Sequence, residues 1–107
     1  MVNLGEFEEI VLLAVLRLED EACAIPVREE ILRRTRRRVA RGALYTALER
    51  LEEKGLLSSR TSEPRPERGG RPRRYFKVTA RGLAAVRVSR QARLSLWQGL
   101  EARLQKP

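Results

Sequence analysis

The sequence predicts a mainly α fold with a small β-hairpin, arranged as a winged helix-turn-helix with a long C-terminal helix. Three observations support this fold class. Residues 41–54 combine one apolar stripe at helical spacing with a free opposite face. Residues 58–61 and 73–78 have the features of two strands, joined by a loop rich in proline and glycine. Residues 80–107 carry apolar residues at roughly helical spacing.

A first helix is predicted over residues 3–19. Asn3 and Glu6 have the spacing of a capping box. Apolar residues then recur at helical intervals over a surface broad enough to face two neighbours: Phe7, Ile10, Val11, Leu13, Ala14, Leu16 and Leu18. We expect the acidic turn at 19–21 to end this helix.

A second, shorter helix is predicted through about Arg34, with Pro26 in its first turn. Proline suits that position because the N–H that it lacks would have no helical partner there. Val27, Ile31 and Leu32 supply a narrow apolar stripe. A short helix, a brief turn and another helix favour a helix-turn-helix, although paired short helices are common in all-α domains.

The third helix, residues 41–54, presents two different faces. Its apolar stripe consists of Leu44, Ala47, Leu48 and Leu51. The free face begins with small residues, so its first half can approach a large partner closely: Gly42, Ala43 and Thr46. Lys54 and Gly55 give a cationic last turn followed by a glycine, which suits a helix C-terminus.

A β-hairpin with a long basic tip follows the third helix. In residues 73–78, Phe76 and Val78 alternate with Tyr75 and Lys77, which fits a strand with one buried face. The ten residues 63–72 include three prolines and two glycines and therefore predict an exposed loop. A helix-turn-helix followed by such a hairpin is a winged helix.

A final helix is predicted after Thr79, which suits its N-cap. Its apolar residues are Leu83, Val86, Leu94, Trp97, Leu100 and Leu104. A helix this long has little of its own small domain to pack against, and pairing with a second copy would bury the stripe. The alternative is that it folds back on the first helix of the same chain.

The charge of the chain is unevenly distributed. Residues 1–32 hold 2 basic and 8 acidic side chains, net −6, whereas residues 33–107 hold 21 basic and 6 acidic side chains, net +15. A basic surface attracts polyanions, nucleic acid before anionic membrane. The simpler alternative is that the arginines only solvate the surface of a thermostable or arginine-biased protein.

Several classes of function lack the residues that they need. There is no histidine and only one cysteine, Cys23, which disfavours an internal disulfide, a zinc site and Cys or Ser/His catalysis. Glutamate pairs at 8–9, 29–30 and 52–53 are typical of solvated helix faces. We therefore expect no enzyme, metal or cofactor. A signal-peptide pattern and an apolar run of roughly 20 residues are both absent, so we expect a soluble, cytoplasmic protein without a membrane partner.

Three stretches of the chain resemble the PadR family of bacterial winged-helix transcriptional regulators. They are LGEFEEIVLLAVL near the start, GALYTALERLEEKGLL in the middle and GGRPRRYFKVTARG after the loop. The resemblance extends from about residue 4 to residue 104. The chain is similar in length to the family branch with a single C-terminal helix. It implies a winged-helix DNA-binding domain at 1–79, a dimerisation helix at 80–107, a homodimer, and operator binding that usually represses transcription.

The chain departs from the family pattern at the start of two helices. Ala40 stands where the family commonly has a polar residue before the recognition helix, and Ala24-Ile25-Pro26 replaces a Gly-Tyr-type pair. In a drug-binding branch, a tryptophan on the C-terminal helix stacks on flat aromatic ligands. Trp97 is therefore expected either in the dimer core, which we favour, or against a small aromatic effector.

The leading hypothesis is a sequence-specific, homodimeric DNA-binding repressor that recognises a pseudo-palindromic operator. The expected DNA-binding residues are Arg41, Gly42, Ala43, Tyr45, Thr46 and Arg50 of the third helix, with Arg71, Arg73 and Arg74 of the wing. Tyr45 would bind a phosphate, and Arg41 and Arg50 a phosphate or a base edge. Like the wing arginines above, Arg65 and Arg68 would follow the DNA backbone or enter an adjacent minor groove.

Two other classes of function remain open at this point. The first is an arginine-rich RNA-binding or architectural protein without sequence preference, which needs only the cationic surface and the arginine cluster at 33–41. The second is a protein-interaction module that uses the terminal helices.

Overall fold

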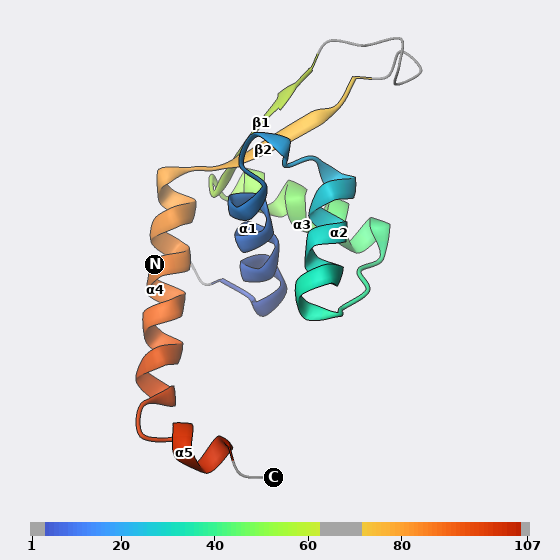
Figure 1. The fold of residues 1–107 in the computed structure, drawn as a ribbon. Coiled ribbons are helices and arrows are strands. Elements are labelled where there is room, and N and C mark those ends of the chain that lie inside the picture. Colours follow the sequence, from blue (N-terminus) through green and yellow to red (C-terminus); the bar gives the residue numbers. More distant parts are fainter. Residues whose placement is uncertain (1–3, 63–71, 106–107) are drawn as a thin grey trace.

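The computed structural model describes residues 4–62 and 72–105. They form α1 (Glu6–Leu18), a 3₁₀ turn η1 (Glu19–Glu21), α2 (Ala24–Thr35), α3 (Arg41–Glu53), β1 (Leu57–Thr61), β2 (Arg74–Val78), α4 (Ala80–Trp97) and α5 (Glu101–Leu104). Figure 1 shows α1 to α3 packed together, the hairpin extending from one end, and α4 running down one side. The predicted mainly α fold with one hairpin is confirmed.

The start of α1 differs from the prediction. Its N-cap is Gly5, whose N–H donates to Glu8 Oε1 at 3.0 Å. The expected cap of Asn3 with Glu6 is therefore wrong, and Asn3 itself lies outside the described residues. Lys54 Nζ lies 2.7 Å from Glu8 Oε2 and holds that carboxylate in the position that completes the cap.

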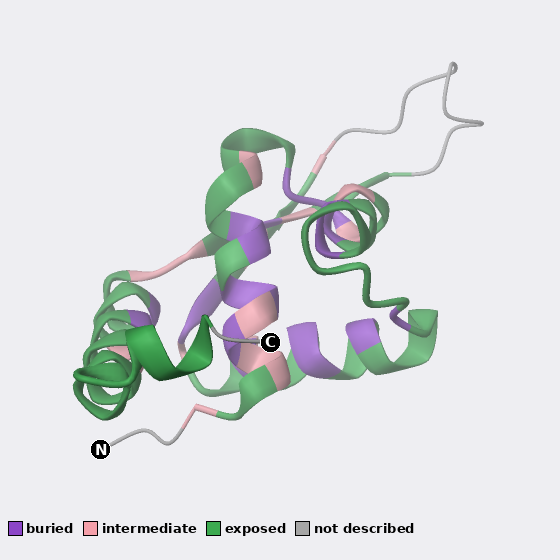
Figure 2. Cartoon of the chain, turned by 60° about the horizontal axis from the view of Figure 1, so that its bottom comes forward, coloured by how far each residue is buried: buried purple, intermediate pink, exposed green. Residues whose placement is uncertain are grey.

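The core lies where the helical stripes and the hairpin meet. The stripe predicted for α3 is buried, as are residues from α1, α2 and the hairpin: Val11, Leu12, Val15, Val27, Ile31, Leu44, Leu48, Leu51, Leu56, Leu57 and Phe76. Figure 2 shows the buried segments of α1, α3 and β2 turned toward one another. Gly55, with φ +76°, ends the α3 region as expected, because the left-handed conformation favours glycine.

The hairpin is antiparallel, with Leu57 opposite Val78 and Ser59 opposite Phe76. Phe76 is buried, so the predicted strand with one buried face is confirmed. Its N–H also donates to the carbonyl of Ala22 at 2.8 Å, which anchors β2 beside the start of α2. The expected basic tip, including Arg65, Arg68 and Arg71, lies outside the described residues.

Helix α4 is attached to the rest by a tight joint. Thr79 Oγ1 accepts from the Gly82 N–H at 3.1 Å, which confirms the predicted cap, and donates to the Gly55 carbonyl at 2.6 Å. A Cβ on Gly82 would lie 2.2 Å from the Leu56 carbonyl oxygen. Only glycine therefore lets α4 approach β1 this closely.

The C-terminal segment is not the single helix that was predicted. Gly99, with φ +83°, separates α4 from the short helix α5. The left-handed glycine lets the chain turn there, and the apolar spacing across 94–104 concealed this break. Helix α4 packs on α1 as far as its second half, where Glu9 of α1 accepts from Ser89 Oγ at 2.6 Å and lies 2.8 Å from Arg93 Nη1. Residues 90–104 are exposed throughout.

Candidate nucleic-acid interface

The turn between α2 and α3 is fixed by hydrogen bonds to its backbone. The Arg36 N–H donates to the Leu32 carbonyl at 2.8 Å, and Arg28 Nε donates to the Val39 carbonyl at 2.7 Å. Val39 itself is buried. Because Val39 immediately precedes the N-cap Ala40, these contacts hold the first turn of α3 in a defined position. Ala40 supplies no side-chain cap, in line with the departure noted from sequence.

The first half of α3 presents the small, exposed surface that the sequence predicts. Gly42, Ala43 and Thr46 are exposed, and a Cβ added to Gly42 would meet nothing within 4 Å. Arg50 is also exposed on this helix. A large partner can therefore approach the backbone of α3 near Gly42 without first displacing another part of the described chain.

A groove runs between this part of α3 and the first turn of α1. It is lined by Gly5, Glu6, Phe7, Glu8, Gly42, Ala43, Thr46, Ala47, Arg50 and Lys54. Its acidic side chains have cationic partners, since Glu6 lies 2.9 Å from Arg37 and Glu8 lies 2.7 Å from Lys54. Burial opposes ionisation of Glu8, but hydrogen bonds from Lys54 and the Gly5 N–H outweigh it, so the pKa of Glu8 lies below its ordinary value. The acidic wall is thus largely neutralised.

A second groove lies on the other side of α3, between that helix, the start of α2 and the approach to β2. Tyr45, 47% exposed, lines this groove together with Pro72 and Arg73. The structure therefore brings a recognition-helix residue and a wing residue to one surface. Glu49 lines the same groove, and with the exposed Glu53 it makes the second half of α3 acidic. These carboxylates repel a polyanion from their side of the helix, whereas Arg50, in the same half of α3, lines the other groove together with Lys54.

Arg74 lines the groove of Tyr45 and Arg73 as well, but its guanidinium is also bound within the chain. Its Nη2 donates to Glu52 Oε1, and its Nε donates to Ser59 Oγ at 3.1 Å. Its guanidinium thus joins the hairpin to α3. Sequence reasoning missed Glu52 and Ser59 as partners of Arg74. The available signal was weak: Glu52 borders the apolar stripe on the helical wheel, on the side of Leu48.

The remaining expected residues are Arg41, Arg71 and Trp97. Arg41 is exposed in the first turn of α3, whereas Arg71 is outside the described residues. Trp97 is 50% exposed and lies on the projecting end of α4, where it lines a shallow apolar pocket with Arg93, Leu96, Leu100 and Leu104.

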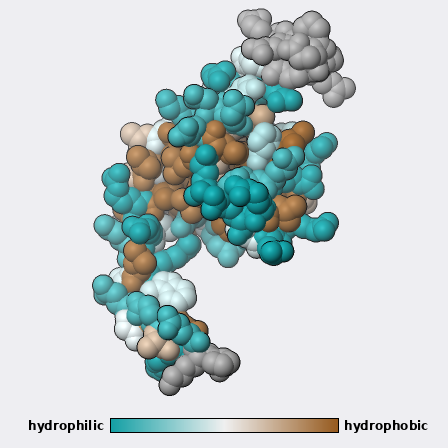
Figure 3. All heavy atoms as spheres, viewed as in Figure 1, coloured by the Kyte–Doolittle hydropathy of each residue, from teal (hydrophilic) through white to brown (hydrophobic). Residues whose placement is uncertain are grey.

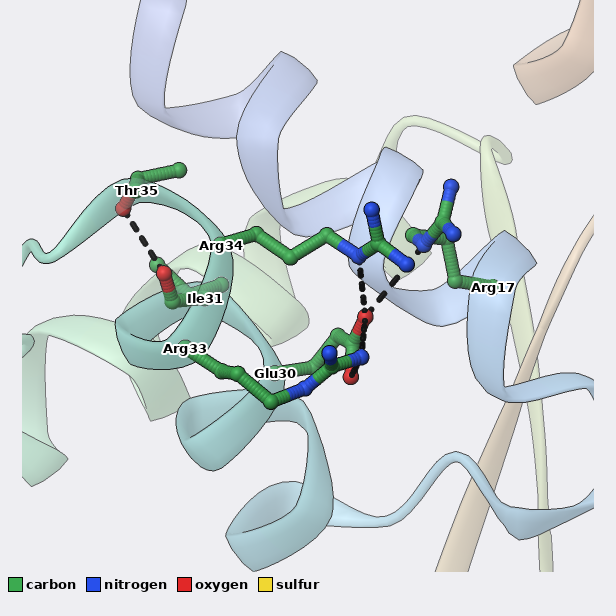
Figure 4. Close-up of polar contacts among 6 residues, drawn as sticks. All are labelled: Arg17, Glu30, Ile31, Arg33, Arg34 and Thr35. Atoms are coloured by element: carbon green, nitrogen blue, oxygen red, sulfur yellow. Dashed lines mark hydrogen bonds and ion pairs between the residues drawn. The ribbon is translucent and has the colours of Figure 1, made fainter.

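Another charged cluster lies between α1 and α2. Figure 4 shows Glu30 surrounded by Arg17, Arg33 and Arg34, at 3.3, 2.8 and 2.9 Å respectively. Hydrogen bonds from Arg33 and Arg34 lower the pKa of Glu30 despite its partial burial. The Glu30 side chain is only 10% exposed, and the arginines provide its carboxylate with hydrogen bonds. We therefore interpret the cluster as structural.

Within the described residues, no group of side chains could hold a metal ion. The helices of that part of the chain are also too short or too polar to cross a membrane.

Comparisons with known proteins agree with this geometry. A PadR-like transcription factor from Bacteroides fragilis is 28% identical, with a TM-score of 0.73 over 92% of this chain and 89% of its own. A PadR family regulator from Eggerthella lenta is 26% identical, with a TM-score of 0.70 over 95% and 88%. One from Clostridium difficile, 22% identical with a TM-score of 0.72 over 92% and 98%, is similar in fold.

A search of curated proteins gave no match. The family model for PadR-like transcriptional regulators matches residues 12–88, which is most of the chain and includes α2, α3, the hairpin and the start of α4. The resemblance noted from sequence is therefore confirmed, and the chain belongs to the PadR-like family of transcriptional regulators.

Proposed function

We propose that two copies of this chain bind a pseudo-palindromic DNA site and repress transcription from it. The observation that carries the proposal is the free surface on the first half of α3, where Gly42, Ala43 and Thr46 are exposed. Tyr45 and Arg50 flank this surface, and Arg73 of the wing shares the groove of Tyr45. Small residues with polar and cationic neighbours suit a helix that enters a major groove.

In this proposal each residue has a separate task. Gly42, Ala43 and Thr46 permit close approach to the base edges. Tyr45 donates its hydroxyl to a phosphate, and Arg41 and Arg50 bind a phosphate or a base edge. Arg73 binds the DNA backbone or enters the adjacent minor groove, and we expect the same of Arg71.

The exposed end of α4 supports a homodimer. Large apolar side chains gather there without cover from the described chain: Leu94, Leu96, Trp97, Leu100 and Leu104. Figure 3 shows apolar atoms on the body beside α1 and again on the projecting helix. Apolar surface of this extent is typical of an interface, and a second copy places two α3 helices on one duplex. In this arrangement Trp97 belongs to the dimer core.

Selection of bound fragments from genomic DNA tests the proposal. We expect one recovered duplex to compete at least roughly a thousandfold better than random duplex at physiological salt. Deleting the gene for this chain should then raise transcription beside the selected site. Equal competition by random duplex or by RNA would instead favour the non-specific, arginine-rich alternative, and a loss of nucleic-acid binding would favour a protein-interaction module.

Tyr45→Phe tests one contact of the proposed interface. The substitution removes a single hydroxyl from a half-exposed side chain, so the fold and the oligomeric state should be unchanged. We expect the affinity for the selected duplex to fall at least about tenfold, the usual effect of losing one hydrogen bond to a charged group. Titration of labelled duplex measures the change. Equal affinity of the two proteins would exclude the hydroxyl from the interface.

A further inference from the structure

Three residues from three different elements form a closed polar network between α3 and the wing. Glu52 lies in α3, Ser59 in β1 and Arg74 at the start of β2. Ser59 Oγ donates to Glu52 Oε2 at 2.7 Å and accepts from Arg74 Nε at 3.1 Å. Arg74 Nη2 donates to Glu52 Oε1. Each member therefore contacts the other two.

The network lies at the edge of the core. Arg74 precedes Phe76 by two residues, so both side chains belong to the same face of β2, the face that carries the buried Phe76. The guanidinium carbon Cζ of Arg74 lies 5.2 Å from the centroid of the Phe76 ring. The side chains of Arg74 and Glu52 are 48% and 31% exposed. Partial burial and a third partner make this contact stronger than an isolated surface ion pair.

We propose that Glu52 is a positioning residue for DNA binding, which holds Arg74, and with it strand β2, in a fixed orientation to α3. This inference rests on the proposed function, in which α3 and the wing contact the same duplex. Two elements that must fit neighbouring grooves together bind more tightly when their relative orientation is set in advance. Arg74 then acts within the protein and not as a phosphate contact.

The sign of one substitution separates the two roles of Arg74. Glu52→Gln breaks the ion pair and removes a negative charge. If Arg74 were a phosphate contact, the freed guanidinium and the lost carboxylate would both tighten binding. If Glu52 positions the wing, binding weakens although the protein has become more cationic. The matched control is Glu53→Gln, which removes the same charge from the next residue, an exposed position of α3.

We expect Glu52→Gln to bind the selected duplex about tenfold more weakly than Glu53→Gln, within the usual coupling range of contacting pairs. Its plot of log K against log salt should also become less steep by up to about one unit for each phosphate contact of the wing that is lost. Removal of an anion that only supported the fold would leave this slope unchanged. Arg73→Ala gives the reference slope for the loss of one expected contact.

Ser59→Ala tests the same network without changing any charge. We expect a loss of affinity in the same direction as for Glu52→Gln but smaller, about threefold, because the Glu52–Arg74 pair remains. Arg74→Gln is measured alone and together with Glu52→Gln. The loss of affinity in the double variant should not exceed the larger of the two single losses. Thermal unfolding and sedimentation of each variant confirm that the protein is folded and in its usual oligomeric state.

The measurements are made on both the selected duplex and a random duplex of equal length. Tighter binding by Glu52→Gln than by Glu53→Gln, or additive losses in the double variant, would overturn the positioning role. Absence of any preference for the selected duplex in the unmodified protein would overturn the proposed function instead. In that case the salt slope on the random duplex still decides the role of Glu52, because phosphate contacts do not depend on sequence.

Discussion

Two regions of this chain use apolar residues in opposite ways. In the body, formed by α1, α2, α3, the hairpin and the first half of α4, the large apolar stripes are buried, as at Leu48 and Leu51. In the distal arm, residues 90–104, Leu94 and Trp97 are about half exposed. Most of the apolar stripe of the body is thus covered within the described chain, although Leu32 and Leu83 stay partly exposed, whereas no described segment covers the apolar side chains of the distal arm.

The largest expected effect is a loss of stability, which should differ between a buried and an exposed leucine of the body. Leu51 is fully buried, and Leu51→Ala should lower the free energy of unfolding by about 2–5 kcal/mol through lost burial and a cavity. Leu32→Ala removes the same atoms from a side chain that is 43% exposed and should cost less than about 1 kcal/mol. Denaturant titration measures both. Similar losses would show that the assignment of core and surface in the body is wrong.

Two glycines provide a comparison within the body. Gly82→Ala places a Cβ 2.2 Å from the Leu56 carbonyl oxygen and should destabilise the fold by about 1–3 kcal/mol, since backbone must move. Gly42→Ala meets nothing within 4 Å and should stabilise α3 by about 0.4–1 kcal/mol. Thermal unfolding of the two variants tests these opposite signs. Stabilisation by Gly82→Ala would mean that α4 does not approach β1 so closely.

The distal arm should respond in a different measurement. Trp97→Ala removes a half-exposed side chain, so the helical content of each chain should persist. The dissociation constant of the proposed dimer should rise about tenfold. Sedimentation over a concentration series measures this. Ala84→Ser, at an exposed position on the first half of α4, is the control. An unchanged dissociation constant for Trp97→Ala would remove Trp97 from the dimer core and favour an effector site.

The same contrast explains how far sequence alone could predict the structure. The α3 stripe, the Gly55 stop and the Thr79 cap depend on neighbours within a few residues, and each was predictable. The contact of Gly82 with Leu56 and the network of Glu52 depend on tertiary packing, so no local pattern revealed them. Gly99 did carry a local signal, but the apolar spacing on both sides of it favoured one uninterrupted helix.

The candidate site divides in the same way. Exposure of Gly42 and Thr46 follows from the position of each residue on the helical wheel, which is a property of α3 alone. Arg74 was expected to contact DNA together with the other arginines of the wing. The strand pattern shows which face of β2 carries Arg74, but it does not show which carboxylate lies opposite that face. The side chain that engages it, Glu52, is 22 residues away in sequence.

The smallest expected effect concerns Glu30, whose cluster of arginines joins α1 to α2 in the body. Its pKa is lowered in the folded state, so the folded chain binds fewer protons than the unfolded chain just below the ordinary glutamate pKa. The resulting stabilisation is fully present above that pKa and is lost as the pH falls through the lower, folded value. The unfolding free energy should therefore fall on acidification.

Glu30→Gln removes this contribution and should reduce the loss of stability between about pH 5 and pH 3. Glu29→Gln, at the exposed neighbouring position of α2, removes the same charge and should keep the pH dependence of the unmodified protein. Urea titrations at several pH values measure the difference. Parallel curves for the unmodified protein and Glu30→Gln would mean that the three arginines do not stabilise the ionised carboxylate in solution. The α1–α2 contact would then depend on its apolar residues alone, as the rest of the body does.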